Sequence, residues 1–161
     1  CYHVPCAMRW PAGIANPGRT ISSFVNHADF APTFCELAGV ALPNGSSGHS
    51  LAPFMRDEQP VEWPDAMHSQ FNGVELYYSQ RWVQTDEWKY VYNGFDLDEL
   101  YDLSEDPDCL LNVAQDPRYA DVVREMCARM WRRAYQERDI CHNAYITVGL
   151  APYGPMVGLR D

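Results

Sequence analysis

The chain has 161 residues, of which 47% are hydrophobic and 13% aromatic, and its formal net charge at pH 7 is −10. This length and composition are typical of a folded domain with a real core and exclude a disordered chain. The acidic balance, with Lys89 as the single lysine, speaks against nucleic-acid binding, and no apolar run approaches the 18 residues of a membrane span.

Residues 3–10, HVPCAMRW, form a short apolar run that ends at Pro11 and predict a buried strand. The chain opens with Cys1 in what reads as the middle of this strand, so we expect a further N-terminal part to precede it. The stretch NHADFAPTFCELAGV then predicts a helix in which Asp29 is the cap, Pro32 lies in the first turn and Gly39 is the stop. Its buried stripe is expected to be Phe30, Phe34, Leu37 and Ala38.

A proline-rich, acidic stretch around residues 51–65 suggests a domain boundary, which we place between residues 58 and 59. From residue 66 the pattern changes to strands rich in Tyr, Trp, Val and Thr. Four strands are predicted, at residues 67–71, 77–85, 88–95 and 99–103. A tight turn at Thr85–Trp88 joins the second and third, and Trp88, Tyr90 and Tyr92 share one face. Together these strands predict a small antiparallel sheet.

The dipeptide Asp116-Pro117 predicts a helix start, a cap followed by a proline in the first turn, and helical spacing continues to residue 137. This helix is expected to cover one face of the sheet with the stripe Tyr119, Val122, Val123, Met126, Met130, Trp131 and Ala134. Residues 59–138 would then form a small α+β subdomain. Residues 139–161 are a Gly/Pro-rich extended tail, which we expect to lie on another surface such as a neighbouring subunit of a homo-oligomer.

The acid-rich stretch ELYDLSEDPDCLLNVAQDP, residues 99–117, invites a calcium interpretation because Asp102, Ser104 and Asp106 alternate like EF-hand ligands. The EF-hand pattern fails, since Pro107 stands where the loop needs Gly and Val113 where it needs a bidentate Glu. The six cysteines include no C-x-x-C pair, so a zinc site is not predicted. We expect reduced thiols, which leans toward a cytoplasmic setting, although the sequence does not name the compartment.

Several stretches in order resemble the C-terminal part of the type I sulfatases in the alkaline phosphatase superfamily. VPCAMRWPAGI is similar to the family's VPxxxRWPGxI, VNHADFAPTFCELAGV to VsxvDlaPTlldlAGv, and GHSLAPFM to GxSLxPLL. RWVQTDEWKYVYN and the acid-rich stretch resemble RxvrTdrwKYvyn and ELYDLxxDPxExxNLaxdP. The resemblance covers roughly residues 2–137 and implies an alkaline phosphatase-like α/β fold. Residues 1–58 would be the end of its large domain, followed by the small four-stranded sheet and its packed helix.

The resemblance implies that the acid-rich stretch is a structural turn. Asp106-Pro107 would make the turn, Asn112 would bond to backbone, and Asp116-Pro117 would cap the following helix. It departs from the family pattern at Cys109 and Leu110, where acidic residues are common.

The family hydrolyses sulfate esters with a formylglycine made from Cys or Ser in a C/S-x-P-x-R motif, together with a divalent cation, usually calcium. No cysteine or serine of this chain has Pro two residues on and Arg four residues on. The chain also lacks the adjacent Asp-Asp pair and the D-N-G or D-H-G that would supply metal ligands. The expectation is therefore that nucleophile and metal site lie outside the chain, that no catalytic residue and no cofactor are held here, and that the chain alone is inactive.

In the family the small sheet leans over the cleft of the large domain, where a small sulfate-ester substrate would bind. This resemblance makes His68, Gln70, Asn72 and Arg81 the candidate substrate-binding residues; the alternative for each is a structural strand or turn residue. The remaining histidines are too scattered for a metal cluster.

The partner expected for residues 1–58 is the rest of the large domain, because an apolar parallel strand needs a sheet on both sides. These residues should be poorly covered on their own. Two alternatives stay open: a phosphonate or phosphate ester hydrolase of the same superfamily, and a non-catalytic binding or assembly module. The second would replace the apolar residues of HVPCAMRW and FAPTFCEL by polar ones, and no such replacement is present.

Overall fold

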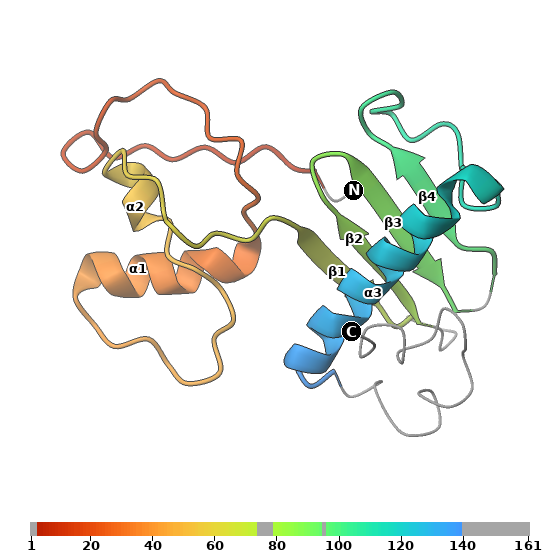
Figure 1. Ribbon diagram of the computed structural model, residues 1–161. Coiled ribbons are helices and arrows are strands. Elements are labelled where there is room, and N and C mark those ends of the chain that lie inside the picture. The colour runs from red at the N-terminus through yellow and green to blue at the C-terminus, as the bar shows by residue number, and fades with distance from the viewer. Residues whose placement is uncertain (1–2, 74–78, 95, 140–161) are drawn as a thin grey trace. The chain divides into compact units, whose positions relative to one another are not determined.

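The computed structural model describes residues 3–73, 79–94 and 96–139, drawn in colour in Figure 1. The chain divides into two units, Cys1–Pro64 and Asp65–Asp161. The first unit contains the helices η1 (His27–Asp29), α1 (Phe30–Ala38) and α2 (Ala52–Met55). The second contains the strands β1 (Met67–Phe71), β2 (Gln80–Gln84), β3 (Trp88–Asn93) and β4 (Glu99–Asp102), followed by η2 (Pro117–Tyr119) and α3 (Ala120–Gln136).

The helix predicted after residue 26 is present, and its end at Gly39 is confirmed. Gly39 adopts φ 66°, the left-handed conformation that suits glycine, and its N–H bonds back to Cys35 and Glu36 carbonyls. The predicted cap at Asp29 is wrong, because that side chain makes no capping bond to α1. A short 3₁₀ turn precedes the helix instead, and Asn26 caps that turn in a reciprocal capping box with Asp29.

The Asp29 side chain is free for another task, which is to join two distant segments. The carboxylate accepts hydrogen bonds from the backbone N–H of Asn26 and of His49, both at 2.8 Å. Beside it, the Thr33 hydroxyl donates to the Asp29 carbonyl and accepts from the N–H of Leu51 at 2.8 Å. Asp29 and Thr33 are 2% and 1% exposed. This buried anchor explains why DFAPT and GHSL recur together in the sequence pattern.

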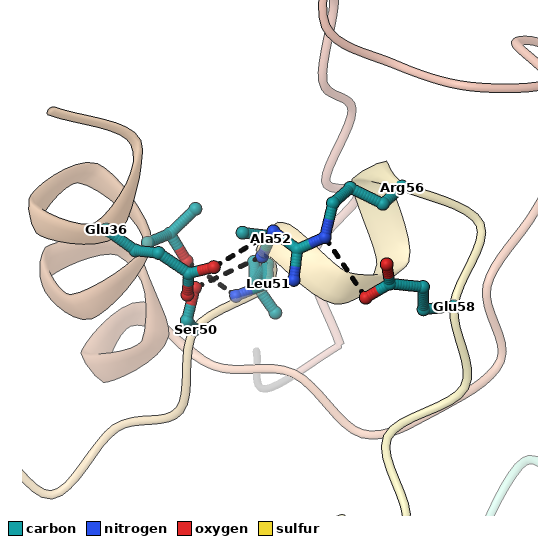
Figure 2. A network of polar contacts seen from close by, with 7 residues as sticks. Glu36, Ser50, Leu51, Ala52, Arg56 and Glu58 are labelled. Atoms are coloured by element: carbon teal, nitrogen blue, oxygen red, sulfur yellow. Dashed lines mark hydrogen bonds and ion pairs between the residues drawn. The ribbon is translucent and has the colours of Figure 1, made fainter. Parts of the chain in front are cut away.

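Outside the anchor, α2 is tied to α1 by exposed polar contacts, which Figure 2 shows. Arg56, at the end of α2, donates to Glu36 of α1 at 2.9 Å and to Glu58 at 3.0 Å. The hydroxyl of Ser50 accepts from the N–H of Ala52 at 3.2 Å. The ion pairs are solvent-exposed and contribute at most about 1 kcal/mol each, so the anchor is the stronger link.

Two expectations for the first unit are wrong. Residues 3–10 form no strand and are exposed along their whole length. The stripe Phe30, Phe34, Leu37 and Ala38 is not buried, with Phe34 65% and Leu37 39% exposed. A parallel strand forms only against neighbouring strands, and a helix stripe is covered only where another layer lies on it. The expectation that residues 1–58 are poorly covered on their own is confirmed by the same exposures.

The second unit contains the predicted sheet, and its four strands are confirmed with slightly shorter bounds. The strands pair antiparallel in the order β1-β2-β3-β4. The register places His68 opposite Val83, Val83 opposite Tyr90, and Tyr90 opposite Leu100. The turn at Thr85–Trp88 is also confirmed, since the N–H of Thr85 donates to the Trp88 carbonyl at 2.8 Å.

The helix α3 lies across one face of this sheet, as Figure 1 shows, and contacts β2 and β3. Its predicted start is confirmed: Asp116 accepts from the N–H of Arg118, and Pro117 opens the 3₁₀ turn before the helix. The core joins one helix face to alternate strand residues. It consists of Ala66, Val83, Tyr90, Tyr92, Leu100, Val123, Met126, Cys127, Met130, Trp131 and Ala134.

The acid-rich loop has the structural role expected for it. The Asn112 side chain accepts from the N–H groups of Leu100 and Ala114 at 3.0 and 2.9 Å. Asp106 accepts from the N–H of Leu111 at 2.8 Å, and Asp102 from the N–H of Ser104 at 3.0 Å. These carboxylates therefore order backbone rather than converge on a common point.

Replacing Asp29 by Ala is expected to lower the free energy of unfolding by about 2–4 kcal/mol, because two backbone N–H groups would lose their acceptor in a buried place. Glu58→Ala, which removes only an exposed ion pair of the same unit, should cost less than about 1 kcal/mol. Urea denaturation of the two variants measures both. Equal losses would show that the buried carboxylate is not an anchor.

Candidate functional site

The first unit carries a cavity of about 430 Å³ between residues 6–10 and α1. Its lining includes Met8, Trp10, Phe30, Phe34, Leu37 and Met55. The lining is mostly apolar, and acid–base or nucleophilic chemistry needs clustered ionisable groups that this cavity lacks. It is suited to receiving apolar side chains. We refer to it as the apolar groove.

The second unit brings three of the four predicted substrate-binding residues onto one sheet face. His68 and Gln70 alternate along β1, and Gln70 pairs with Arg81 of β2 in the register. This face is the one that carries Val83 and Tyr90 and is covered by α3. Asn72 follows the end of β1 and is exposed. The sequence therefore placed His68, Gln70 and Arg81 together correctly, whereas their contact with a substrate stays a prediction.

His68 lies in a partly buried position beside two arginines of α3. Burial, with the charges of Arg133 and Arg129, lowers the pKa of His68 from 6.5 to about 4. Arg129 reaches back from the helix to Asp65, just before β1, with a 2.8 Å ion pair. Asp65 opposes the effect of the arginines only in part. At neutral pH, His68 is therefore an uncharged imidazole that can donate one hydrogen bond and accept one.

Arg81 is fixed by a buried ion pair that the sequence did not predict. Its guanidinium donates to Asp139 through Nε at 3.0 Å and through Nη2 at 2.5 Å, and also to the hydroxyl of Ser79. The two charged side chains are 4% and 6% exposed. The guanidinium also lies 5.2 Å from the ring centre of Trp131. Arg81 thus ties β2 to the end of α3.

A second buried polar group, also missed from sequence, joins β3, the start of β4 and α3. The Tyr90 hydroxyl donates to Asp98 at 2.5 Å, and Asp98 also accepts from the N–H of Asn93 at 3.0 Å. Burial raises the pKa of Asp98 and that of Tyr90. Burial also raises the pKa of the Cys127 thiol to about 12, so this cysteine is inert at neutral pH. An aspartate preceding a short strand gives no sequence signal for such a network.

The described residues do not fit the metal or the formylglycine of the family. Among residues 3–73, 79–94 and 96–139, no group of three or more His, Cys, Asp or Glu side chains is placed to hold a metal ion. Their best-ordered carboxylates, including Asp29 and Asp106, accept backbone hydrogen bonds. The cysteines Cys6, Cys35, Cys109 and Cys127 are free thiols, and none stands in a C/S-x-P-x-R motif. No helix in the described part of the chain is long and apolar enough to cross a membrane.

The family model described as N-sulphoglucosamine sulphohydrolase, C-terminal, matches residues 1–136. The chain belongs to the sulfatase family, as its C-terminal part. The N-acetylglucosamine-6-O-sulfatase of Bacteroides thetaiotaomicron is 30% identical over 149 residues, which cover 86% of this chain and 26% of the relative. Human arylsulfatase K is 37% identical over 121 residues, or 70% of this chain and 22% of the relative.

The solved phosphonate monoester hydrolase of Agrobacterium radiobacter has the same fold over this region. It superposes with a TM-score of 0.69 at 28% identity and covers 74% of this chain and 27% of its own. The alkaline phosphatase-like fold class and the four-stranded sheet with its C-terminal helix are thereby confirmed. This sulfatase chain spans about a quarter of the length of the curated relatives it matches.

The lowered pKa of His68 predicts a pH-dependent stability for this sulfatase unit. The unfolded chain takes up a proton near pH 6.5 and the folded chain only near pH 4, so stability is complete above pH 6.5. It should fall by about 2–3 kcal/mol as the pH drops from 6.5 to 4. In His68→Gln this part of the pH dependence should vanish, whereas Gln70→Asn should retain it. Urea titrations at several pH values measure it, and an unchanged profile in His68→Gln would contradict the assignment.

The Arg81–Asp139 pair predicts a non-additive mutant cycle. Asp139→Ala leaves the buried guanidinium without its carboxylate and should cost about 3–5 kcal/mol. Replacing both partners, as Arg81→Met with Asp139→Leu, should recover most of that loss because no charge is then buried. Thermal unfolding of the single and double variants measures the coupling. Strictly additive losses would mean that the pair is not coupled.

Proposed function

We propose that the chain is the C-terminal part of an enzyme that hydrolyses sulfate esters of sugars. The observation that carries the proposal is the family match over residues 1–136, a family described by a sulphoglucosamine sulphohydrolase. The relative from Bacteroides thetaiotaomicron acts, by its name, on the 6-O-sulfate of N-acetylglucosamine. A sugar sulfate ester is therefore the substrate class that we expect for the complete protein.

In this proposal the chemistry belongs to residues outside the chain. Formylglycine would supply the nucleophile and a divalent cation, calcium in the usual family pattern, would stabilise charge on the sulfate oxygens. The chain's free cysteines lack the required motif, and its ordered carboxylates are already engaged by backbone donors. The 161-residue chain alone is accordingly proposed to be inactive.

Each unit has a proposed role in the complete enzyme. The apolar groove of the first unit would pack against the rest of the large α/β domain, which would cover exposed side chains such as Phe34 and Leu37. The second unit would present His68, Gln70 and Asn72 to the substrate. Arg81 would act by positioning this face, because its guanidinium already binds Asp139.

A phosphonate or phosphate ester hydrolase remains the second candidate, favoured by the similarity to the Agrobacterium radiobacter enzyme. Sulfur and phosphorus esters are distinguished by residues that contact the reacting group, and this chain contains none of the family's nucleophile or metal motifs. The sulfatase reading is preferred because the family model and both curated relatives described above are sulfatases.

The test compares the complete protein with the 161-residue chain on three substrates: 6-O-sulfated N-acetylglucosamine, 4-nitrophenyl sulfate and a 4-nitrophenyl phosphonate monoester. We expect the complete protein to hydrolyse both sulfate esters with a higher kcat/KM than the phosphonate, and the chain alone to hydrolyse none. A preference for the phosphonate would establish the second candidate. Turnover by the pure chain would overturn the division of labour proposed above.

A further inference from the structure

Basic residues are concentrated on α3 and its flanks, in contrast to the acidic remainder of the chain. Six of the twelve basic residues lie between residues 118 and 138, against three acidic residues in the same segment. The other six basic residues are spread over a remainder that holds nineteen acidic ones. The basic residues of this segment are Arg118, Arg124, Arg129, Arg132, Arg133 and Arg138. Such a local reversal of charge is the usual mark of a surface that meets an anion.

Two of these arginines converge on one point of the sheet. Arg129 and Arg133 are four residues apart and so lie on the same side of the helix. Their charges act on His68, whose side chain is on the helix-covered face of β1. The ion pair between Arg129 and Asp65 places this guanidinium beside the beginning of the strand. His68, Arg129 and Arg133 therefore form one cluster, which we call the arginine cluster.

The present partners of the arginine cluster are weak competitors for an anion. Arg129 pairs with Asp65, whose side chain is 81% exposed, and Arg133 pairs with Glu137, whose side chain is 47% exposed. Exposed pairs of this kind contribute at most about 1 kcal/mol each. A guanidinium binds a sulfate through two parallel N–H donors, and two such forks side by side favour a group with several acceptor oxygens. The neutral imidazole of His68 adds a donor without adding charge.

From this placement we infer that Arg129 and Arg133, with His68 between them, bind a sulfate group of a sulfated saccharide chain. The inference rests on the proposed function, because it takes its ligand from the proposed substrate class. It goes further in assigning the complete protein a second anion-binding place on α3, so that a polysulfated chain is held more tightly than a monosulfated sugar.

The test measures binding of dextran sulfate to the complete protein at pH 7 and low salt by titration calorimetry, with unsulfated dextran as the neutral probe. Arg129→Gln with Arg133→Gln is expected to raise the Kd for dextran sulfate about tenfold, through the loss of two charge-assisted contacts. The matched control, Arg118→Gln with Arg124→Gln, removes the same charge from the same segment and should change the Kd less than about twofold. Arg129→Lys with Arg133→Lys keeps the charge but loses the fork, and should give an intermediate Kd.

Equal weakening in the two glutamine pairs would reduce the effect to overall charge and overturn the inference, as would an unchanged Kd in Arg129→Gln with Arg133→Gln. If that pair does not fold, judged by its circular dichroism, the lysine pair decides: a wild-type Kd overturns the inference. Hydrolysis of 4-nitrophenyl sulfate by the unmodified protein tests the proposed function separately. A protein that hydrolyses this ester but fails the binding test retains its function and loses the arginine cluster.

Discussion

The second unit depends on the packing of α3 against the sheet. Tyr90 and Leu100 on the strands and Cys127 on the helix are fully or almost fully excluded from solvent. Because strands alternate with period two and the helix repeats every 3.6 residues, only one face of each can enter this contact. The same packing orients the polar groups above it: it places His68 beside Arg129 and holds Arg81 against Trp131. Every functional assignment in this unit follows from that contact.

The first unit has a different logic, because its stability rests on polar anchoring more than on a closed core. Asp29 and Thr33 are buried and satisfy the backbone of segments some twenty residues apart. The apolar residues beside them stay exposed and form the apolar groove. A helix with a satisfied polar side and an uncovered apolar side is what a piece of a larger domain presents when only that piece is considered. This contrast between the units supports a sulfatase whose catalytic residues lie elsewhere in the protein.

The sequence predicted the second unit well because all its signals agreed. Strand alternation, the turn at Thr85, the cap at Asp116 and the helix stripe all pointed to one sheet and one helix. The first unit was predicted less well: residues 3–10 form a strand only with partners, so local pattern could not decide their state. The site shows the same limit. Chain alternation brought His68 and Arg81 to one face, but the ion pair with Asp139, 58 residues away, depends on tertiary packing that no local pattern encodes.

The central claim is that this chain is one part of a longer sulfatase and holds no catalytic machinery of its own. The most direct test is the intact denatured mass of the protein isolated from its source, followed by N-terminal sequencing. The account predicts a mass well above the 18.4 kDa of these residues, with a C/S-x-P-x-R motif upstream of Cys1. A protein of 18.4 kDa that begins at Cys1 and hydrolyses sulfate esters in a metal-dependent way would contradict it.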